Sequence, residues 1–428
     1  MKHAAAAEIN SLKRIFYSDY GEDPVRMTKI EAILKDLRAA GADVCRTSRS
    51  PLHTVARNLV LPNLIERSMQ DAGITLHPSV RDTDRDVRIQ AATFQYDHPK
   101  KSARDCFTSM YMYRQYIEHE LTSFGPDLVI LWHQFNAYHY VIAEWCKREN
   151  VPVIYAENGL LPGSWCFEYQ GQMGESWIAR NPETFAALPL DTADKEHADV
   201  YLKTAVTQKL NRKSPGLSVA DAGLKQTLDN DPRPRILYAG INDFKTGLQP
   251  FTRRRSLLHS GDFISTEAGL KELLPLARKN GWHLLYKAHP SIKHAAEGLE
   301  DYADCLTVVD KRVDLIDLFT YVDTLVTIVS QSAYMALMHE TPVVLLGRMQ
   351  LSGSGMVAEA PYRANLEHAV YAALDSVVSQ EALRDHIARL IRYYVVSSEY
   401  SERGHFYYDL SDLAPSFLRA DRQQRGST

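Results

Sequence analysis

The chain has 428 residues, of which 45% are hydrophobic and 24% are charged, and its formal net charge is −4. This length exceeds what one ordinary hydrophobic core organises, so it predicts two or three domains. The charge balance creates no basic field of the kind that attracts nucleic acid, and no nucleic-acid partner is expected.

Compartment signals point to a reduced cytoplasmic protein. No apolar run reaches the roughly 20 residues that a membrane-spanning helix needs. Glu8, Asn10 and Lys13 interrupt the N-terminal segment, which therefore lacks the apolar core of a signal peptide. The five cysteines are scattered without a CxxC pair, which disfavours a zinc knuckle or a disulfide framework.

Strand and helix patterns alternate through the first half of the chain. Short apolar runs predict strands at 14–17, 127–132 and 151–154. Helical spacing predicts helices at 27–39, 55–69, 103–121, 137–150 and 196–213. The charged stretch 81–88 contains Asp82, Asp84 and Asp86, but interleaved arginines neutralise them. This stretch is predicted as a solvated loop in preference to a metal-binding DxD motif.

The same alternation continues in the second half. Strands are predicted at 235–239, 282–288, 306–309, 324–329 and 343–346. Helices are predicted at 270–280, 315–321, 333–339, 367–375 and 381–395. A polar tail follows Ala420 and is expected to be disordered.

This alternation is typical of α/β proteins with parallel, doubly wound sheets. We expect two Rossmann-like domains with a cleft between them, joined near Asp231 by the polar segment 214–234. The predicted domains are residues 1–231 and 232–420, followed by the tail 421–428. Neither half contains GxGxxG or a Walker A loop, which disfavours a nicotinamide enzyme or a P-loop ATPase.

Glu157 is the candidate catalytic group of the first half. It follows the buried strand pattern Val153-Ile154-Tyr155, and the next two residues, Asn158-Gly159, favour a sharp turn. Ligands bind at the carboxyl ends of parallel strands in open α/β sheets, so a carboxylate there is a candidate for chemistry. The alternative is a turn residue that faces water.

Two strand ends of the second half carry candidate chemical groups, a carboxylate at one and a histidine at the other. Asp243 follows the strand 235–239, and Lys287-Ala288-His289-Pro290 ends the strand 282–288. His289 could donate to a phosphate, and Pro290 fits the first turn of a helix whose N-terminus attracts anions. The alternative for His289 is a capping or core histidine.

A third strand end carries Ser330-Gln331-Ser332, between an apolar strand and a predicted helix. Hydroxyl groups there can cap the helix, or they can join its N–H groups in holding a phosphate. Arg253, Arg254 and Arg255 could contact an anionic substrate, although a solvated basic loop is the simpler interpretation.

Taken in order, these motifs resemble a known group. Glu157-Asn158-Gly159, His289-Pro290 and Ser330-Gln331-Ser332 are similar to the (D/E)-(D/E)-G, HP and S-S motifs of bacterial GT-B enzymes that use CMP-sugars. That group includes polysialyltransferases and Kdo transferases. The surrounding sequence, from Asp127 to Gly347, is closer to the capsule-type retaining β-Kdo glycosyltransferases.

The resemblance implies a GT-B fold in which the C-terminal domain binds the donor CMP-Kdo and the N-terminal domain binds the acceptor. It implies transfer with retention by double displacement, with Asp243 as the nucleophile and Glu157 as the acid/base. His289 and Ser330 or Ser332 would hold the phosphate of CMP without a metal ion. Met335 stands where the family has a glutamate, so a ribose contact from that position is not expected.

The implied partners are a CMP-sugar donor and a saccharide or lipid-linked glycan acceptor in capsule or lipopolysaccharide O-antigen synthesis, with no separate cofactor. Peripheral association with assembly machinery at the inner membrane is a further expectation. Lys287 and the arginines at 253–255 are candidates for contacting the carboxylate of Kdo. Three alternatives stay open: inversion with Glu157 as the base, a sialyltransferase-like enzyme, and a non-catalytic polysaccharide-assembly protein.

Overall fold

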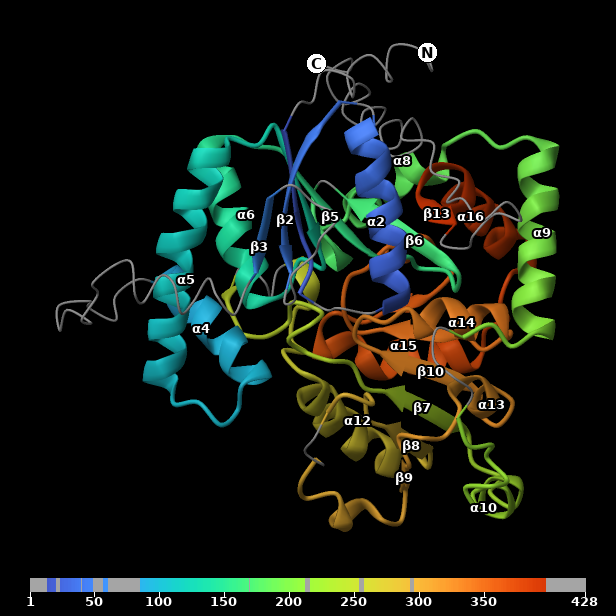
Figure 1. Cartoon of the computed structure of the whole chain (residues 1–428). Helices are drawn as coiled ribbons and strands as arrows, with labels where there is room; N and C mark the ends of the chain where they lie inside the picture. Colours follow the sequence, from blue (N-terminus) through green and yellow to red (C-terminus); the bar gives the residue numbers. More distant parts are fainter. Residues whose placement is uncertain are drawn as a thin grey trace. The chain divides into compact units, whose positions relative to one another are not determined.

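A computed structural model describes residues 14–20, 24–39, 41–48, 57–60, 85–168, 170–211, 216–253, 258–292 and 296–397 (Figure 1). Packing divides the chain into two units. The first unit contains the chain up to Asn158, residues 164–171 and the chain from Val396 onward. The second unit contains residues 159–163 and 172–395. Each unit is an α/β structure, as the alternation of elements predicted.

The first unit is built on a sheet with the strand order β13-β6-β5-β4-β1-β2-β3 in the described part of the chain. Its strands are β1 (Arg14–Ser18), β2 (Asp43–Ser48), β3 (Arg57–Val60), β4 (Leu128–Trp132), β5 (Val153–Asn158), β6 (Ser164–Glu168) and β13 (Val395–Ser397). Strands β1 to β5 pair with one another in parallel, and β6 runs antiparallel to β5. The order β3-β2-β1-β4-β5 is that of a Rossmann sheet, with its topological switch point between β1 and β4.

Helices cover both faces of the first sheet (Figure 1). They are α2 (Pro24–Ala39), α4 (Arg85–Asp97), α5 (Ala103–Phe124) and α6 (Ala137–Glu149). Strand β1 shows why, because its side chains alternate between two separate cores. Phe16 packs with apolar residues of α4, α5 and α6, whereas Ile15 and Tyr17 pack with α2. A strand covered on both faces is apolar throughout, which is the pattern visible in the sequence.

The second unit contains a parallel sheet with the order β12-β11-β10-β7-β8-β9. Its strands are β7 (Arg235–Ala239), β8 (His283–Lys287), β9 (Leu306–Val309), β10 (Thr324–Thr327), β11 (Val343–Leu345) and β12 (Ala358–Glu359). In chain order this is the Rossmann order, with the switch point between β7 and β10. Two Rossmann-like units are therefore confirmed, and the expected cleft between them stays a prediction.

The helices of the second unit include short ones before the sheet and longer ones around it. They are α7 (Trp177–Arg180), α8 (Pro182–Ala186), α9 (Thr192–Thr207), α10 (Lys225–Asp229), α12 (Thr266–Asn280), α13 (Leu315–Phe319), α14 (Ser332–Met338), α15 (Arg363–Leu374) and α16 (Gln380–Tyr393). Short 3-10 turns lie at Met173–Glu175 and Glu300–Tyr302.

Three sequence predictions of local structure were wrong. The helix predicted at 55–69 is replaced at Arg57–Val60 by strand β3, whose partner β2 overrides the helical spacing. Helix α4 begins at Arg85, within the predicted charged loop, while Asp82 and Asp84 lie outside the described residues. The first sheet was also expected to be parallel throughout, but β6 runs antiparallel to β5.

Packing also assigns residues 172–231 to the second unit, before the boundary that the sequence suggested at Asp231. Helix α9 packs against α16, and Lys195 of α9 donates to Asp385 of α16 over 3.0 Å. Arg389 of α16 donates to the carbonyl of Leu188. The polar composition of residues 214–234 suggested a linker there, but composition does not show contacts between segments that are far apart in the chain. The tail 421–428 lies outside the described residues.

Candidate functional site

The carboxyl edge of the second sheet brings three predicted strand ends together. Strands β10, β7 and β8 are neighbours, so the segments after them meet at the same edge. The β7 and β8 segments are joined directly, because Asn242 Nδ2 donates to Ser291 Oγ over 2.7 Å. Asp243 and Ser330 follow the two strands that flank the switch point, which is where open α/β sheets bind ligands.

Asp243 is a half-buried carboxylate held at the start of α12. Its Oδ1 accepts hydrogen bonds from the backbone N–H and from the hydroxyl of Thr266, both over 2.9 Å. Burial raises the pKa of Asp243 to about 6, although the bonds from Thr266 favour the ionised form. A carboxyl group with this pKa changes charge near neutral pH, which suits either nucleophilic or acid/base chemistry.

Gly240 allows the close packing of this corner. A Cβ atom at this position would lie 2.9 Å from Cγ2 of Thr266, the residue that holds Asp243. Gly240 N also donates to the carbonyl of Lys287 over 2.9 Å, which ties the end of β7 to the end of β8.

His289 lies in the segment after β8 with a defined hydrogen-bonding pattern. Its Nδ1 accepts from Ser291 N over 3.2 Å and lies 2.8 Å from Ser291 Oγ. Because Nδ1 accepts, the neutral ring carries its proton on Nε2. The helix expected to begin at Pro290 is not formed, so that prediction was wrong. Instead the chain turns, with Ile292 N donating to His289 O over 2.9 Å, and residues 293–295 lie outside the described residues.

The segment Ser330-Gln331-Ser332 begins α14. Ser330 Oγ accepts from Ser332 N over 3.1 Å and from Ser332 Oγ over 2.8 Å. Gln331 occupies the N-cap position. The observed role of Ser330 is therefore to cap the first turn, and a contact with phosphate stays a prediction.

The candidate cations have different surroundings. Lys287 is buried, and its Nζ donates to the carbonyl of Lys311 over 2.7 Å. Arg253 is exposed, while Arg254 and Arg255 lie outside the described residues. The structure thus places the Lys287 ammonium beside the residues that follow β9, and its contact with a substrate stays a prediction.

Glu157 belongs to the first unit, where it lies within β5 and opposite Cys166 of β6. Its side chain is buried, with the residue only 6% exposed, and Cys166 Sγ donates to its Oε1 over 3.6 Å. The alternative of a turn residue facing water is therefore wrong. Burial of a carboxyl group costs free energy unless hydrogen bonds, an ion pair or protonation compensates for the lost solvation.

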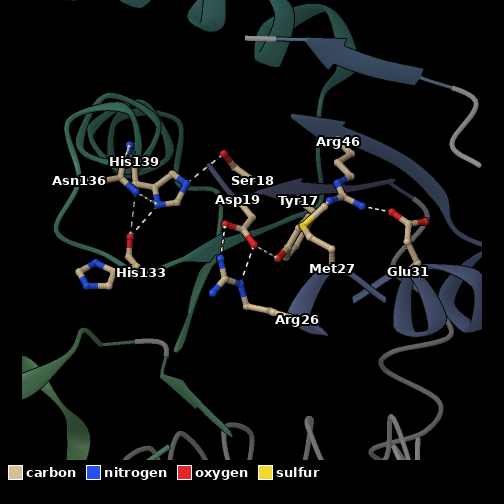
Figure 2. Close-up of polar contacts among 10 residues, drawn as sticks. All are labelled: Tyr17, Ser18, Asp19, Arg26, Met27, Glu31, Arg46, His133, Asn136 and His139. Carbon is tan, nitrogen blue, oxygen red and sulfur yellow. Dashed lines mark hydrogen bonds and ion pairs between the residues drawn. The ribbon is translucent and has the colours of Figure 1, made fainter. Parts of the chain in front are cut away.

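Sequence analysis missed a polar cluster at the carboxyl edge of the first sheet (Figure 2). It contains residues at or directly after the ends of β1 and β4 and residues of β2, α2 and α6. They are Ser18, Asp19, Arg26, Arg46, His133 and His139, together with Thr47, which Figure 2 does not draw. The sequence signal was present, since Ser18-Asp19 and His133 directly follow apolar strands. Only the strand order shows that they flank the switch point between β1 and β4.

The contacts of this cluster form two connected sets. Thr47 Oγ1 donates to Ser18 Oγ over 2.7 Å, Ser18 Oγ lies 3.0 Å from His139 Nε2, and His139 Nδ1 lies 2.6 Å from the carbonyl of His133. Beside them, Arg26 forms an ion pair with Asp19 at 2.9 Å, and Arg46 forms one with Glu31. Burial lowers the pKa of His139 to about 4, so its ring is neutral at physiological pH.

A comparison with protein families finds a match within the second unit. Residues 248–394 match the family described as capsule polysaccharide biosynthesis protein. The match covers about a third of the chain and includes His289 and Ser330. It confirms the resemblance to capsule-type proteins that the sequence motifs indicated.

Solved structures give a weaker likeness over more of the chain. KpsC from Thermosulfurimonas dismutans, described as a β-Kdo 2,7 transferase, is 13% identical with a TM-score of 0.46 and covers 95% of this chain and 99% of its own. The β-Kdo 2,4 transferase of the same organism's KpsC is 16% identical with a TM-score of 0.44, covering 63% and 81%. A UDP-GlcNAc 2-epimerase from Methanocaldococcus jannaschii is 9% identical with a TM-score of 0.36, covering 96% and 99%. No curated protein sequence matches the chain.

Within the part of the chain that the structure describes, no helix is long and apolar enough to cross a membrane.

Proposed function

We propose that this protein is a glycosyltransferase that moves Kdo from CMP-Kdo to a saccharide acceptor in capsule or lipopolysaccharide O-antigen synthesis. The observation that carries the proposal is the set of strand ends at the carboxyl edge of the second sheet. Asp243, His289 and Ser330 follow three neighbouring strands there, within or next to the segment that matches the capsule family. The motif order that resembles CMP-sugar enzymes supports the choice of donor.

In the proposed reaction, Asp243 attacks the anomeric carbon of Kdo while the bond to the phosphate oxygen of CMP breaks. Thr266 holds Oδ1 of Asp243, so Oδ2 is the attacking atom. The acceptor hydroxyl then displaces the carboxylate from the glycosyl adduct and gives its proton to Glu157. Two displacements retain the anomeric configuration.

The departing phosphate needs hydrogen-bond donors. His289 can donate from Nε2, because its Nδ1 accepts from Ser291. Because the Ser332 hydroxyl donates to Ser330 Oγ, the hydroxyl of Ser330 and the ammonium of Lys287 are the other proposed donors. The proposal assigns no metal ion to this step, and it places the reaction in the cytoplasm, where association with assembly machinery at the inner membrane would deliver the glycan acceptor.

The test is to incubate the purified protein with CMP-Kdo and a panel of glycan acceptors, measuring CMP release and the configuration of the product by NMR. A β-linked product supports retention, and an α-linked product would establish inversion with Glu157 as the base. Competition between CMP-Kdo and CMP-sialic acid separates the two donor classes. CMP release that matches the Asp243→Asn plus Glu157→Gln double variant would overturn the proposal.

A further inference from the structure

His133 has an unusual backbone for its place in the fold. Its φ angle is 72°, in the left-handed region that residues other than glycine rarely adopt. Asn150, Lys209 and Glu340 also have positive φ angles, but they lie at the ends of helices, where this conformation is ordinary. Met173, which begins a short 3-10 turn, is a further described residue with a positive φ angle. His133 instead follows strand β4 directly, at the switch point of the first sheet.

Several hydrogen bonds hold His133 in this conformation. Its backbone N–H donates to the carbonyl of Ala156 over 2.7 Å, one residue before Glu157. Its carbonyl accepts from His139 Nδ1 over 2.6 Å, and His139 is itself held by Ser18. Figure 2 shows His139 between Ser18 and the carbonyl of His133. A strained conformation that its surroundings fix in this way is typical of residues that contact a ligand.

The ring of His133 is also oriented. Its Nδ1 accepts from Phe135 N over 3.2 Å, so the neutral ring carries its proton on Nε2. The residue is half-buried. Since Ala156 accepts from His133 N, the positions of His133 and Glu157 are adjacent along the carboxyl edge, on the neighbouring strands β4 and β5.

On the other side of the switch point, Asp19 is fully buried and the geometry of its carboxylate is also fixed. Arg26 Nε and Nη2 donate to its two oxygens over 2.9 and 3.2 Å. The Arg26 guanidinium lies over the ring of Trp132, 4.7 Å from the centroid. The ion pair thus makes the end of β1 rigid, and the oriented imidazole of His133 offers a hydrogen-bond donor that a hydroxylated ligand can use.

The charges of the described residues at this edge are balanced. Arg26 is paired with Asp19 and Arg46 with Glu31, while His139 is neutral. The carboxyl group of Glu157 is the further acidic group of the edge. There is thus no excess of positive charge among these groups to bind a phosphate or a carboxylate.

We propose that His133, together with the Asp19–Arg26 pair, forms a binding site for an uncharged sugar residue of the acceptor at the switch point of the first sheet. The inference rests on the proposed function and specifies its acceptor class. His133 Nε2 donates to one sugar hydroxyl, and Asp19, which is fully buried, contributes by holding the Arg26 guanidinium in place. Glu157, at the adjacent position, is then placed to take the proton of the attacking hydroxyl.

The experiment uses the full chain, the His133→Gly and His133→Asn variants, and Asn150→Gly as a matched control. Glycine and asparagine both accept a positive φ angle, so these changes alter the ring and spare the backbone. Asn150 has a φ angle of 55° at the end of α6 in the same unit. The ligands are matched pairs of methyl glycosides, glucoside with glucuronide and galactoside with galacturonide, studied by saturation-transfer NMR.

The expected result is that wild-type protein binds at least one neutral glycoside more tightly than its uronic acid partner. His133→Gly should weaken that binding roughly three- to tenfold, the size expected for one neutral hydrogen bond. Asn150→Gly should leave it unchanged, and His133→Asn should restore part of it. Equal binding by wild type and His133→Gly, no binding of any neutral glycoside, or a preference for the uronic acids would overturn the inference.

Enzyme kinetics separate this inference from the proposed function. His133→Gly should raise the KM for a neutral acceptor by the same factor and leave acceptor-independent release of CMP within about twofold. An equal loss of both activities would overturn the acceptor assignment. Absence of CMP release by the wild-type protein would instead refute the proposed function, while the NMR comparison would still decide whether His133 binds sugar.

Discussion

The two sheets share a strand order but differ at their switch points. In the first sheet, the edge between β1 and β4 carries the ion pair Asp19–Arg26, with a second pair on the neighbouring β2, and a separate set of hydrogen bonds that joins His139 to His133. In the second sheet, the edge between β7 and β10 carries one carboxylate with a raised pKa, together with hydroxyls and the His289 imidazole nearby. The first edge is charge-balanced and rigid, which suits recognition, whereas the second has a group poised to change charge, which suits chemistry.

Of the changes that test this comparison, replacing the proposed nucleophile of the second unit should have the largest effect, and the affected quantity is the rate of transfer. Asp243→Asn preserves the shape of the side chain and removes its charge. Transfer should fall at least about 10⁴-fold, because a covalent intermediate can no longer form. The measurement is single-turnover transfer from CMP-Kdo. A loss of less than about tenfold would mean that Asp243 only caps α12.

Replacing the proposed acid/base of the first unit should have a smaller effect. Glu157→Gln should slow transfer about 10²- to 10³-fold, as expected for the loss of general base catalysis. Formation of the Kdo adduct on Asp243, followed by mass spectrometry, should persist in this variant. If adduct formation also disappears, Glu157 acts in the first displacement and not on the acceptor.

The stability of the two edges should respond to pH with opposite signs. The pKa of His139 is lowered from 6.5 to about 4 by burial, so the unfolded chain binds its proton first as pH falls. The contribution of His139 to the free energy of unfolding is therefore present above pH 6.5. It is lost between pH 6.5 and 4, by about 3 kcal/mol. Urea unfolding of wild type and His139→Asn should show this slope only in the wild type.

For Asp243, the free energy of unfolding should change with pH in the opposite direction. Its pKa is raised from 3.8 to about 6, so its protonated form stabilises the fold. This contribution is present below pH 3.8 and is lost as pH rises to 6, again by about 3 kcal/mol. Urea unfolding of Asp243→Asn should therefore lack a decline that wild type shows over this range. Parallel pH curves for the two proteins would contradict the buried environment of this carboxyl.

The smallest expected effect tests the boundary between the two units, that is, the assignment of residues 172–231 to the second unit. Lys195 of α9 pairs with Asp385 of α16, and both side chains are partly exposed. Lys195→Met should therefore lower the free energy of unfolding by about 1 kcal/mol or less. The same change at Lys203, an exposed lysine of α9, is the control. A loss in the Lys195 variant alone would sharpen the assignment of residues 172–231 to the second unit.

Apolar strands followed by polar residues were visible in the sequence. A strand buried on both faces requires a run of apolar residues, whereas the residues after the strand end are not buried in this way and can be polar. For that reason the sequence alone determined the α/β class, most of the strands, and the candidates Glu157, Asp243 and His289. It also determined the motif order that resembles CMP-sugar enzymes. Strand β3 and the antiparallel β6 were missed, because pairing with a neighbouring strand overrode the local pattern.

Only the tertiary structure decided which strand ends are neighbours. Hydrogen bonding between strands far apart in the chain places β4 beside β1 and β10 beside β7, and this pairing makes Asp19 and His133 flank one switch point. The strained backbone of His133 is equally invisible in the sequence, because it depends on bonds from His139 and to Ala156. Local sequence encodes how each segment folds, whereas contacts between distant segments determine which polar groups share an edge.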